Sequence, residues 1–497
     1  MYVLGIDLGT SSVKVSVVEL SSAKTIVTVQ YPESERAIIN LQPGWAEQNP
    51  EQWWSDVQQA ILKANATQLY NPKHIQAIGI AYQMHGLVLI DNQYQPLRNS
   101  IIWCDSRAVP YGDAALNALG NEFCLTHLLN SPGNFTAAKL AWVKDNEPHI
   151  FNQIHQVLLP GDFIALKFTG HATTTESALS EGIFWDFKEK QISNELLQYF
   201  NFNKQFFPDI HPVFSKHGEL LTNIAENLGL KPGIPVTYKA GDQPNNALSL
   251  NVSEPGEFAA TAGTSGVIYG VSEQLIYDHQ SRINSFAHVN YQHQSQRIGV
   301  LLCINGTGIL NSWLKKITGS IHSYENMNAL AEQVPAGSEG LLMLPFGNGA
   351  ERILMNKTLF AHVANIDLNK HGEAHFYRAA QEGIAFAFKY GLNIMRSIQI
   401  SPSVIRAGKA NMFLSQLFAD VFVQNTGVPL HLYNNDGSAG AALGAAIGLG
   451  VFTSIKDAMK YQQPIQIIEP DKYKMEHYAA LYEKWEALLN EKMNNHL

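Results

Sequence analysis

The 497-residue sequence has few cysteines, few charged residues and no apolar run long enough to span a membrane. Its three cysteines, Cys104, Cys124 and Cys303, are an odd number without metal-ligand spacing, which is typical of a protein from a reducing compartment. Charged residues make up 15% of the chain, and no tract rich in lysine or arginine offsets the net charge of −9. We therefore expect no nucleic-acid partner and no anionic-membrane partner.

Two further signals are missing near the N-terminus. Residues 1–6 have neither the basic segment nor the small-residue cleavage site of a secretory signal, so we expect a cytoplasmic location. The first predicted strand is not followed by Gly-x-Gly-x-x-Gly, which argues against a dehydrogenase that uses a nicotinamide dinucleotide.

The length of the chain and its hydrophobic content of 45% predict two globular domains. Short predicted strands, such as residues 13–18, 75–81 and 235–240, alternate with helical segments, which indicates an α/β fold. We expect a short helix within residues 245–257 and place the domain boundary there, giving domains 1–246 and 247–497. A final surface helix is predicted over residues 473–497.

The clearest feature that is present is a pair of similar hairpins. Residues 7–14 read Asp-Leu-Gly-Thr-Ser-Ser-Val-Lys, and residues 261–267 read Thr-Ala-Gly-Thr-Ser-Gly-Val. Each segment joins two strand-like runs through Gly-Thr-Ser, where backbone N–H groups and small hydroxyls can surround an anion. Such turns are also common in ordinary hairpins, but their repetition at about half the chain length favours two facing phosphate-binding turns.

Only the first hairpin carries a carboxylate, because Asp7 corresponds to Thr261 in the second. A lone acid beside a phosphate site suits Mg²⁺ coordination. A second acid, Asp242, follows a predicted strand and precedes Pro244, a residue suited to the first turn of a helix. Asp242 could therefore act as a catalytic base held at a strand end, and the alternative is a helix N-cap without catalytic function.

These three motifs, the Asp7 hairpin, Gly241-Asp242 and the Gly263 turn, resemble the FGGY carbohydrate kinases in order and spacing over nearly the whole chain. The resemblance implies two ribonuclease-H-like domains, as in actin and hexokinase, that close over ATP and a sugar. It also implies that Asp242 is the general base and that Asp7 orients Mg²⁺ arriving with the nucleotide. The residues that it implies along the phosphate path are Thr10, Ser11, Ser12, Lys14, Gly263, Thr264 and Ser265.

The sugar class is indicated by residues 83–86, whose sequence Gln-Met-His-Gly resembles a loop of the xylulokinases within this family. The resemblance implies transfer of the γ-phosphoryl group of ATP to the C5 hydroxyl of D-xylulose. A histidine between two strands is otherwise more often structural. The residues expected to contact the sugar are Gln83, Met84, His85, Trp103, Asp242 and Gln243. Near Trp103, we expect Asp105 and Arg107 to form a structural ion pair.

The resemblance places further nucleotide contacts in the second half of the chain, at Gly408, Lys409, Asn411 and Gly440. The family usually has three consecutive glycines where this sequence has Arg406-Ala407-Gly408, so the two added side chains could narrow the adenosine site. Residues 344–352 resemble a further family segment, for which we expect a structural role.

Three alternatives stay open. The acceptor could be another sugar of the same family, such as ribulose, another ketose or gluconate. The chain could instead be a sugar sensor, or an actin-like ATPase whose closure drives partner binding. Either of these would turn over nucleotide without stimulation by a sugar. The resemblance also makes a homodimer possible.

Overall fold

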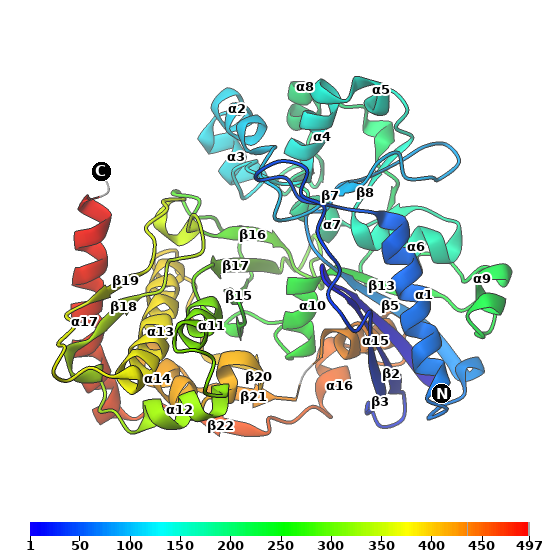
Figure 1. The fold of residues 1–497 in the computed structure, drawn as a ribbon. Coiled ribbons are helices and arrows are strands. Elements are labelled where there is room, and N and C mark those ends of the chain that lie inside the picture. The colour runs from blue at the N-terminus through cyan, green and yellow to red at the C-terminus, as the bar shows by residue number, and fades with distance from the viewer. Residues whose placement is uncertain (435, 496–497) are drawn as a thin grey trace.

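The computed structural model describes residues 1–434 and 436–495 and contains two large mixed sheets with helices packed around them (Figure 1). The first sheet has the order β13-β5-β1-β2-β3. Strands β1, β2 and β3 form an antiparallel meander, and β5 and β13 run parallel to β1. Their bounds are β1 Tyr2–Leu8, β2 Val13–Glu19, β3 Thr25–Tyr31, β5 Ile75–Tyr82 and β13 Val236–Gly241.

The second sheet repeats this plan. Strands β14, β15 and β17 form an antiparallel meander, and β20 and β21 run parallel to β14. Strands β16 and β22 extend the two edges, giving the order β16-β17-β15-β14-β20-β21-β22. The bounds are β14 Glu257–Ala262, β15 Gly266–Ser272, β16 Asn284–Ala287, β17 Ile298–Ile304, β20 Val404–Gly408, β21 Leu430–Tyr433 and β22 Gln466–Ile468. The duplication predicted from the two hairpins is confirmed.

Helices cover both sheets. Helix α1 begins after Asn49, whose side chain caps the helix, and Pro50 occupies its first turn as the sequence predicts. The helices of the first half are α1 Pro50–Ala66, α2 Val109–Leu119, α3 Asn121–His127, α4 Thr136–Asn146, α5 Pro148–Phe151, α6 Pro160–Thr169, α7 Glu176–Glu181, α8 Asn194–Phe200, α9 Thr222–Asn227 and α10 Asp242–Ser249. In the second half they are α11 Gly308–Ile317, α12 Tyr324–Glu332, α13 Glu373–Ser397, α14 Gln416–Thr426, α15 Gly437–Gly448, α16 Ile455–Met459 and α17 Lys472–Asn495.

Smaller strands form two-residue or three-residue ladders outside the large sheets. These are β4 Glu47–Gln48 with β7 Ser100–Ile101, β6 Val88–Ile90 with β8 Gln156–Leu158, β9 Thr173–Thr174 with β12 Asp209–Ile210, β10 Trp185–Asp186 with β11 Gln191–Ile192, and β18 Leu342–Leu344 with β19 His362–Ala364. The predicted tail helix corresponds to α17, and the last two residues of that prediction lie outside the described residues. Of the helices described, none combines the length and the apolar character that crossing a membrane requires.

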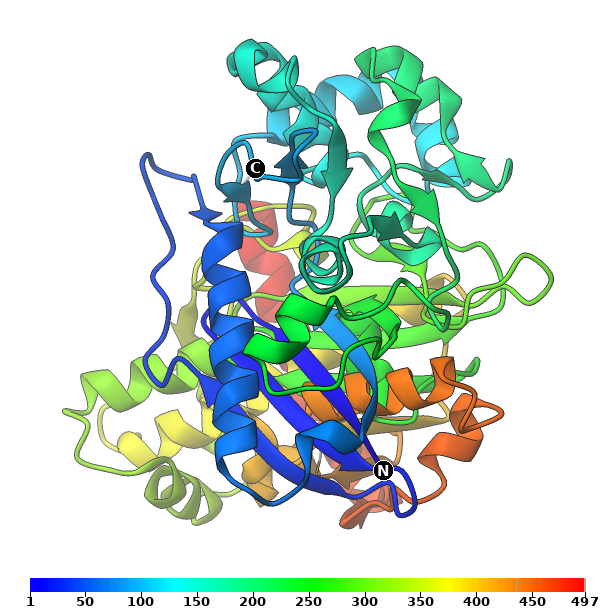
Figure 2. The same ribbon diagram turned by 90° about the vertical axis from the view of Figure 1, so that its right-hand side faces the viewer.

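Helix α15 belongs to the second half of the sequence but packs on the first sheet, as the views in Figures 1 and 2 show. Glycines of the sheet permit this contact. A Cβ added at Gly5 of β1 would lie 1.9 Å from the carbonyl oxygen of Ser438 on the helix. A Cβ added at Gly79 of β5 would lie 2.0 Å from the carbonyl oxygen of Ala441. The glycines on the sheet and the small residues on the helix therefore let the two backbones approach closely.

The connection between the halves differs in detail from the prediction. The short helix α10 begins at Asp242, three residues before the predicted start at residue 245. It ends at Ser249, well before Glu257. Residues 246 and 247, where we predict the domain boundary, therefore lie inside this helix. Strand β14 of the second sheet begins at Glu257.

Candidate active site

The carboxyl ends of three parallel strands bring distant residues together at one edge of the first sheet. In the ladders, Leu8 of β1 pairs with Tyr82 of β5, and Tyr82 pairs with Gly241 of β13. The chain leaves these strands as the Gly9 turn, the Gln83 loop and Asp242. Open α/β sheets commonly bind ligands at such strand ends.

Two of the predicted residues, Asp7 and Asp242, form a pair of interacting acids. Burial and the negative charge of Asp7 raise the pKa of Asp242 to about 7. Burial and the charge of Asp436 raise the pKa of Asp7 to about 6, and the Lys14 ammonium acts in the opposite direction. Asp242 is the first residue of α10, so its carboxyl group lies beside the N–H groups of that helix. A carboxyl group with a pKa near neutrality suits proton transfer at physiological pH.

Asp436 is a functional candidate that the sequence analysis missed. It is the N-cap of α15, where its Oδ1 accepts a hydrogen bond from the backbone N–H of Ser438 at 2.9 Å. Its Oδ2 lies 3.5 Å from Nζ of Lys14. A Cβ added at Gly437 would lie 2.4 Å from Oδ2 of Asp7, so the start of α15 contacts the first hairpin. The signal was available, because Asp-Gly-Ser directly precedes the small-residue helix.

The second hairpin is supported by a loop that the sequence analysis also missed. The backbone N–H groups of Gly308 and Ile309, at the start of α11, donate to the carbonyl oxygens of Gly263 and Thr264 at 2.9 Å and 3.1 Å. The loop before α11 is held by Glu351, which accepts from the N–H groups of Asn305 and Gly306 at 2.9 Å and 2.8 Å. Burial raises the pKa of Glu351 to about 7. This contact gives Glu351 the structural role that we expect for residues 344–352.

The predicted nucleotide residues of the second half do not all meet at this turn. Asn411 does, because its Nδ2 lies 3.6 Å from the position of a Cβ added at Gly263. Lys409 instead donates to Oε1 of Gln466 at 3.1 Å, on the exposed edge strand β22. Gly440 packs on α10, since an added Cβ would lie 2.4 Å from Cβ of Ser249. Helix packing therefore accounts for Gly440, and its contact with a nucleotide stays a prediction.

Arg406-Ala407-Gly408, where the family usually has three glycines, lies within strand β20. The guanidinium of Arg406 donates to Oε1 of Glu257 at 3.0 Å and also to the carbonyl oxygen of Asn251. The Ala407 side chain is buried. Both added side chains are thus occupied by contacts inside the fold, and Gly408 is the residue at the strand end.

The predicted sugar residue Gln83 takes part in a hydrogen-bond network with neighbouring residues. Its Oε1 accepts from the Thr10 hydroxyl at 3.2 Å, and its Nε2 donates to Oε1 of Gln48 at 2.9 Å. The exposed Trp103 donates from Nε1 to the same Thr10 hydroxyl at 2.9 Å. These bonds connect the predicted sugar loop to the first phosphate turn.

His85 is held in a defined tautomer. Burial lowers the pKa of its imidazole to about 3, so the ring is neutral. Its Nδ1 lies 3.0 Å from the carbonyl oxygen of Glu181. Because a carbonyl oxygen only accepts, Nδ1 carries the proton, and the lone pair of Nε2 has no hydrogen-bond donor among the residues that the structure describes. Nε2 can therefore accept a hydrogen bond from a ligand hydroxyl.

The expected ion pair between Asp105 and Arg107 is confirmed. Nη2 of Arg107 lies 2.7 Å from Oδ2 of Asp105, and both side chains are buried. The same guanidinium lies 3.8 Å from the ring centroid of Trp45 and bonds Oε1 of Glu47 at 2.7 Å. Asp105 also accepts from the backbone N–H of Ala46 at 2.5 Å. The pair therefore stabilises the loop that presents Trp103.

Glu181 lies beside the site, where its surroundings favour the protonated form of the carboxyl group. Burial and the charge of Asp242 raise the pKa of Glu181 well above its usual value, and its carboxyl group is hydrogen-bonded to Tyr82. A Cβ added at Gly241 would lie 2.7 Å from Oε2 of Glu181, so a glycine is required directly before Asp242.

A neutral carboxylic acid and an amide have nearly the same shape and both can donate a hydrogen bond. We therefore expect E181Q to keep its melting temperature and to change kcat less than threefold. E181A should lower the melting temperature because it leaves a cavity in the buried position. Thermal melts and sugar-stimulated ADP release test both variants, and a large loss of activity in E181Q would show that Glu181 acts as an anion.

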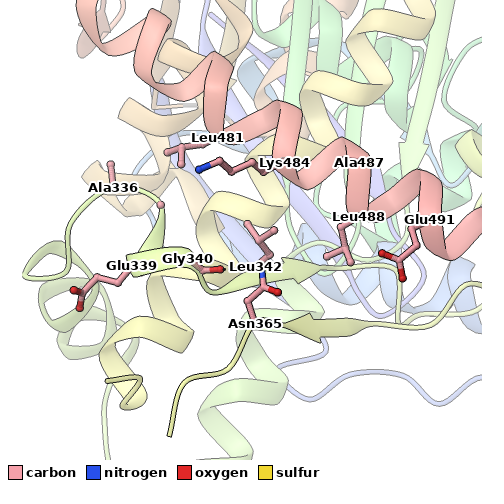
Figure 3. A pocket seen from close by; sticks show the side chains of 11 residues that line it. Ala336, Glu339, Gly340, Leu342, Asn365, Leu481, Lys484, Ala487, Leu488 and Glu491 are labelled. Atoms are coloured by element: carbon pink, nitrogen blue, oxygen red, sulfur yellow. Dashed lines mark hydrogen bonds between the residues drawn. The ribbon is translucent and has the colours of Figure 1, made fainter. Parts of the chain in front are cut away.

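A cavity of about 640 Å³ lies away from these residues, between α17 and the loop that carries Glu339 and Gly340 (Figure 3). Leucines from α17 and from β18 line it together with Lys484 and Glu491. Helix α17 packs on the second half of the chain, far from β1 in Figure 1. This cavity contains none of the predicted site residues.

The fold thus carries a Gly-Thr-Ser turn on each of two similar sheets, and Asp242, with its raised pKa, lies at the strand ends of the first sheet. The chain belongs to the FGGY family of carbohydrate kinases: the model of the family's N-terminal domain matches residues 2–249, and the model of its C-terminal domain matches residues 258–451. The protein is therefore a carbohydrate kinase.

Curated relatives agree with this assignment, and solved structures share the fold. The chain is 31% identical to the xylulose kinase of Escherichia coli (strain K12) over 452 residues, which cover 90% of this chain and 89% of that protein. Its fold matches the xylulose kinase structure from Rhodospirillum rubrum with a TM-score of 0.86 at 24% identity, covering 98% of each chain. It matches the gluconate kinase structure from Lactobacillus acidophilus with a TM-score of 0.89 at 21% identity, covering 99% of this chain and 98% of that one.

Proposed function

We propose that this carbohydrate kinase transfers the γ-phosphoryl group of ATP to the C5 hydroxyl of D-xylulose, forming D-xylulose 5-phosphate and ADP. The observation that carries the proposal is the juxtaposition of the Gln83–Gly86 loop with Asp242. A Cβ added at Gly241, next to Asp242, would lie 2.6 Å from Cγ of Met84. The backbone of Glu181 fixes the His85 ring beside the same point. The curated relatives named xylulose kinase support this choice of sugar.

Asp242 is the proposed general base. Its carboxylate would accept the proton of the sugar hydroxyl as that oxygen attacks the phosphoryl group, and its pKa of about 7 suits this transfer. The Nε2 lone pair of His85 would accept a hydrogen bond from another hydroxyl of the sugar. A site that uses such bonds discriminates against sugars that lack the hydroxyl.

The backbone N–H groups of the two Gly-Thr-Ser turns and the Lys14 ammonium would bind the phosphates. Asp7 and Asp436 fit a divalent cation, because the charge of Asp436 raises the pKa of Asp7 and a nearby cation would relieve this repulsion. In the part of the chain that the structure describes, no cluster of three acidic, histidine or cysteine side chains could hold a metal by itself. Mg²⁺ would accordingly enter with ATP and supply charge stabilisation to the transferred group.

The two halves of the chain contribute to one site. Arg352 of the second half lies 5.8 Å from the ring centroid of Phe135 in the first half. Burial and the charges of Lys139 and Arg352 lower the pKa of His85. Closure of the halves around the sugar would exclude water, so we expect the basal ATPase rate to be low and to rise with the acceptor.

The experiment that tests the proposal is ADP release from Mg-ATP, first without sugar and then with D-xylulose, D-ribulose, L-ribulose, gluconate or glycerol. Stimulation by D-xylulose well above that by the other compounds is the expected result. Stimulation by a different acceptor would keep the roles of Asp7 and Asp242 and reject the proposed sugar. Equal ATPase rates with and without every compound would reject the kinase mechanism for this chain.

A further inference from the structure

We propose that Lys139 is a positioning residue for the acceptor site, where its amino group holds the backbone of His85 so that Nε2 of the ring faces the sugar. This inference rests on the proposed function, because it assigns His85 to the binding of the acceptor. Lys139 lies on α4, and nothing in its local sequence distinguishes it from a surface lysine.

The position of Lys139 is unusual for a lysine. Its side chain is fully buried, although lysines are rarely buried without a charged partner. Its Nζ donates to the carbonyl oxygen of His85 at 2.8 Å, its one hydrogen bond within the part of the chain that the structure describes. Burial lowers the pKa of Lys139 to about 7. An alkyl side chain would fill the same space without the free-energy cost of desolvating an amine.

The group that Lys139 holds is conformationally strained. His85 has a φ of 62°, in the left-handed region that residues with a side chain rarely adopt. Such a conformation persists only where the surroundings enforce it, and it is frequent at functional sites. The lysine bond acts on the peptide group that follows Cα of His85, whose orientation depends on this conformation.

The imidazole ring is fixed separately from the backbone. Its Nδ1 is bonded to Glu181, and its ring centroid lies 4.9 Å from that of Phe135 and 5.4 Å from that of Phe286. With the ring packed on these groups and the backbone held by Lys139, Nε2 has one orientation. Loss of the lysine bond would therefore release the backbone of the loop while leaving the fold of α4 in place.

The test is K139M, which keeps the length and apolar volume of the side chain but removes the donor. We expect the KM for D-xylulose to rise about tenfold, as for the loss of one hydrogen bond to a charged or polarised donor. The KM for ATP should stay within twofold of the wild-type value. The melting temperature should stay close to the wild-type value, because the loss of the bond to the His85 carbonyl oxygen is offset by no longer burying an amine.

Helix α4 offers a matched control. Lys144 donates from Nζ to the backbone carbonyl oxygen of Phe200 at 2.7 Å, the same type of bond, but it lies toward the other end of the helix and away from His85. K144M should leave both KM values unchanged. K139Q, which retains an N–H donor on a shorter side chain, should have a KM for D-xylulose between those of the wild type and K139M. K139L, which also lacks a donor, replaces K139M if that variant does not fold.

Two results would overturn the inference. One is a K139M protein, or a K139L protein in its place, with the wild-type KM for D-xylulose. The other is a rise of both KM values together with a lower melting temperature, which would mean a general structural role. Failure of the proposed function is seen separately, because it would appear in the wild-type enzyme as absent stimulation by D-xylulose. If another compound of the panel stimulates the wild type, the same comparison is made with that compound.

Discussion

The D242N substitution is expected to lower the rate of sugar-dependent ADP release about a thousandfold, which lies in the range expected for loss of a general base. The asparagine side chain has the shape of the carboxyl group but cannot accept the proton of the sugar hydroxyl. Binding of ATP should be retained, because the turns at Gly9 and Gly263 do not depend on a proton acceptor at position 242. Initial rates with and without D-xylulose measure the first effect, and calorimetric titration with Mg-ATP measures the second.

E195Q is the control for D242N. Glu195 is likewise an acid in the first turn of a helix, α8, but its side chain is exposed and far along the chain from the site. The E195Q substitution removes a helix-terminal charge of the same kind and should leave turnover unchanged. Turnover of D242N within tenfold of the wild type would reject Asp242 as the base and favour the helix N-cap interpretation.

The fold could be predicted from the sequence because it is a duplication marked by glycines. The two Gly-Thr-Ser turns identify the first hairpin of each half, and the strands beginning at Ile75 and Val236 have the short, buried pattern of parallel strands. The strand pairings that bring Leu8, Tyr82 and Gly241 to one level follow from tertiary packing and are not visible in local sequence. Candidate residues were therefore found one by one, and their common location came from the structure.

What the sequence could not show is how single side chains are used. Gln83 looks like a free hydrogen-bonding group, but each end of its amide already makes one hydrogen bond, to Thr10 and to Gln48. Gly440 looks like an opening for a ligand, but its missing side chain is required by the packing of α15 on α10. In each case the physical reason lies in a contact between segments more than 30 residues apart, which no local pattern encodes.

Three acids of this site lie in buried positions, where ionisation of the carboxyl group is unfavourable. Asp7, Asp242 and Glu181 all have raised pKa values, and burial is the first cause for each. A proton acceptor with a pKa near 7 is useful for catalysis, but it means that the folded state holds a proton more tightly than the unfolded chain does. The same placement therefore predicts a cost in stability at pH values where the enzyme is active.

D242N should accordingly be more stable than the wild type at pH 8, and the difference should disappear near pH 4. The pKa of Asp242 rises from its ordinary 3.8 to about 7 on folding, so between these values the folded protein keeps a proton that the unfolded chain releases. Raising the pH through this window destabilises the folded wild type by about 4 kcal/mol, and the asparagine variant escapes that loss. The sign is opposite to that of a carboxylate stabilised by a salt bridge.

Melting temperatures of D242N, E195Q and the wild type, recorded without nucleotide from pH 4.5 to pH 8, measure this difference. The melting temperature of D242N should exceed that of the wild type by an amount that grows as the pH rises and levels off above about pH 7. E195Q should follow the wild type throughout. A constant offset would mean that the substitution changes packing alone, and a less stable D242N at pH 8 would mean that the charged carboxylate is well solvated in the folded protein. Since stability and turnover are measured on the same variant, a protein that is both inactive and stabilised would tie the raised pKa of Asp242 directly to its use as a base.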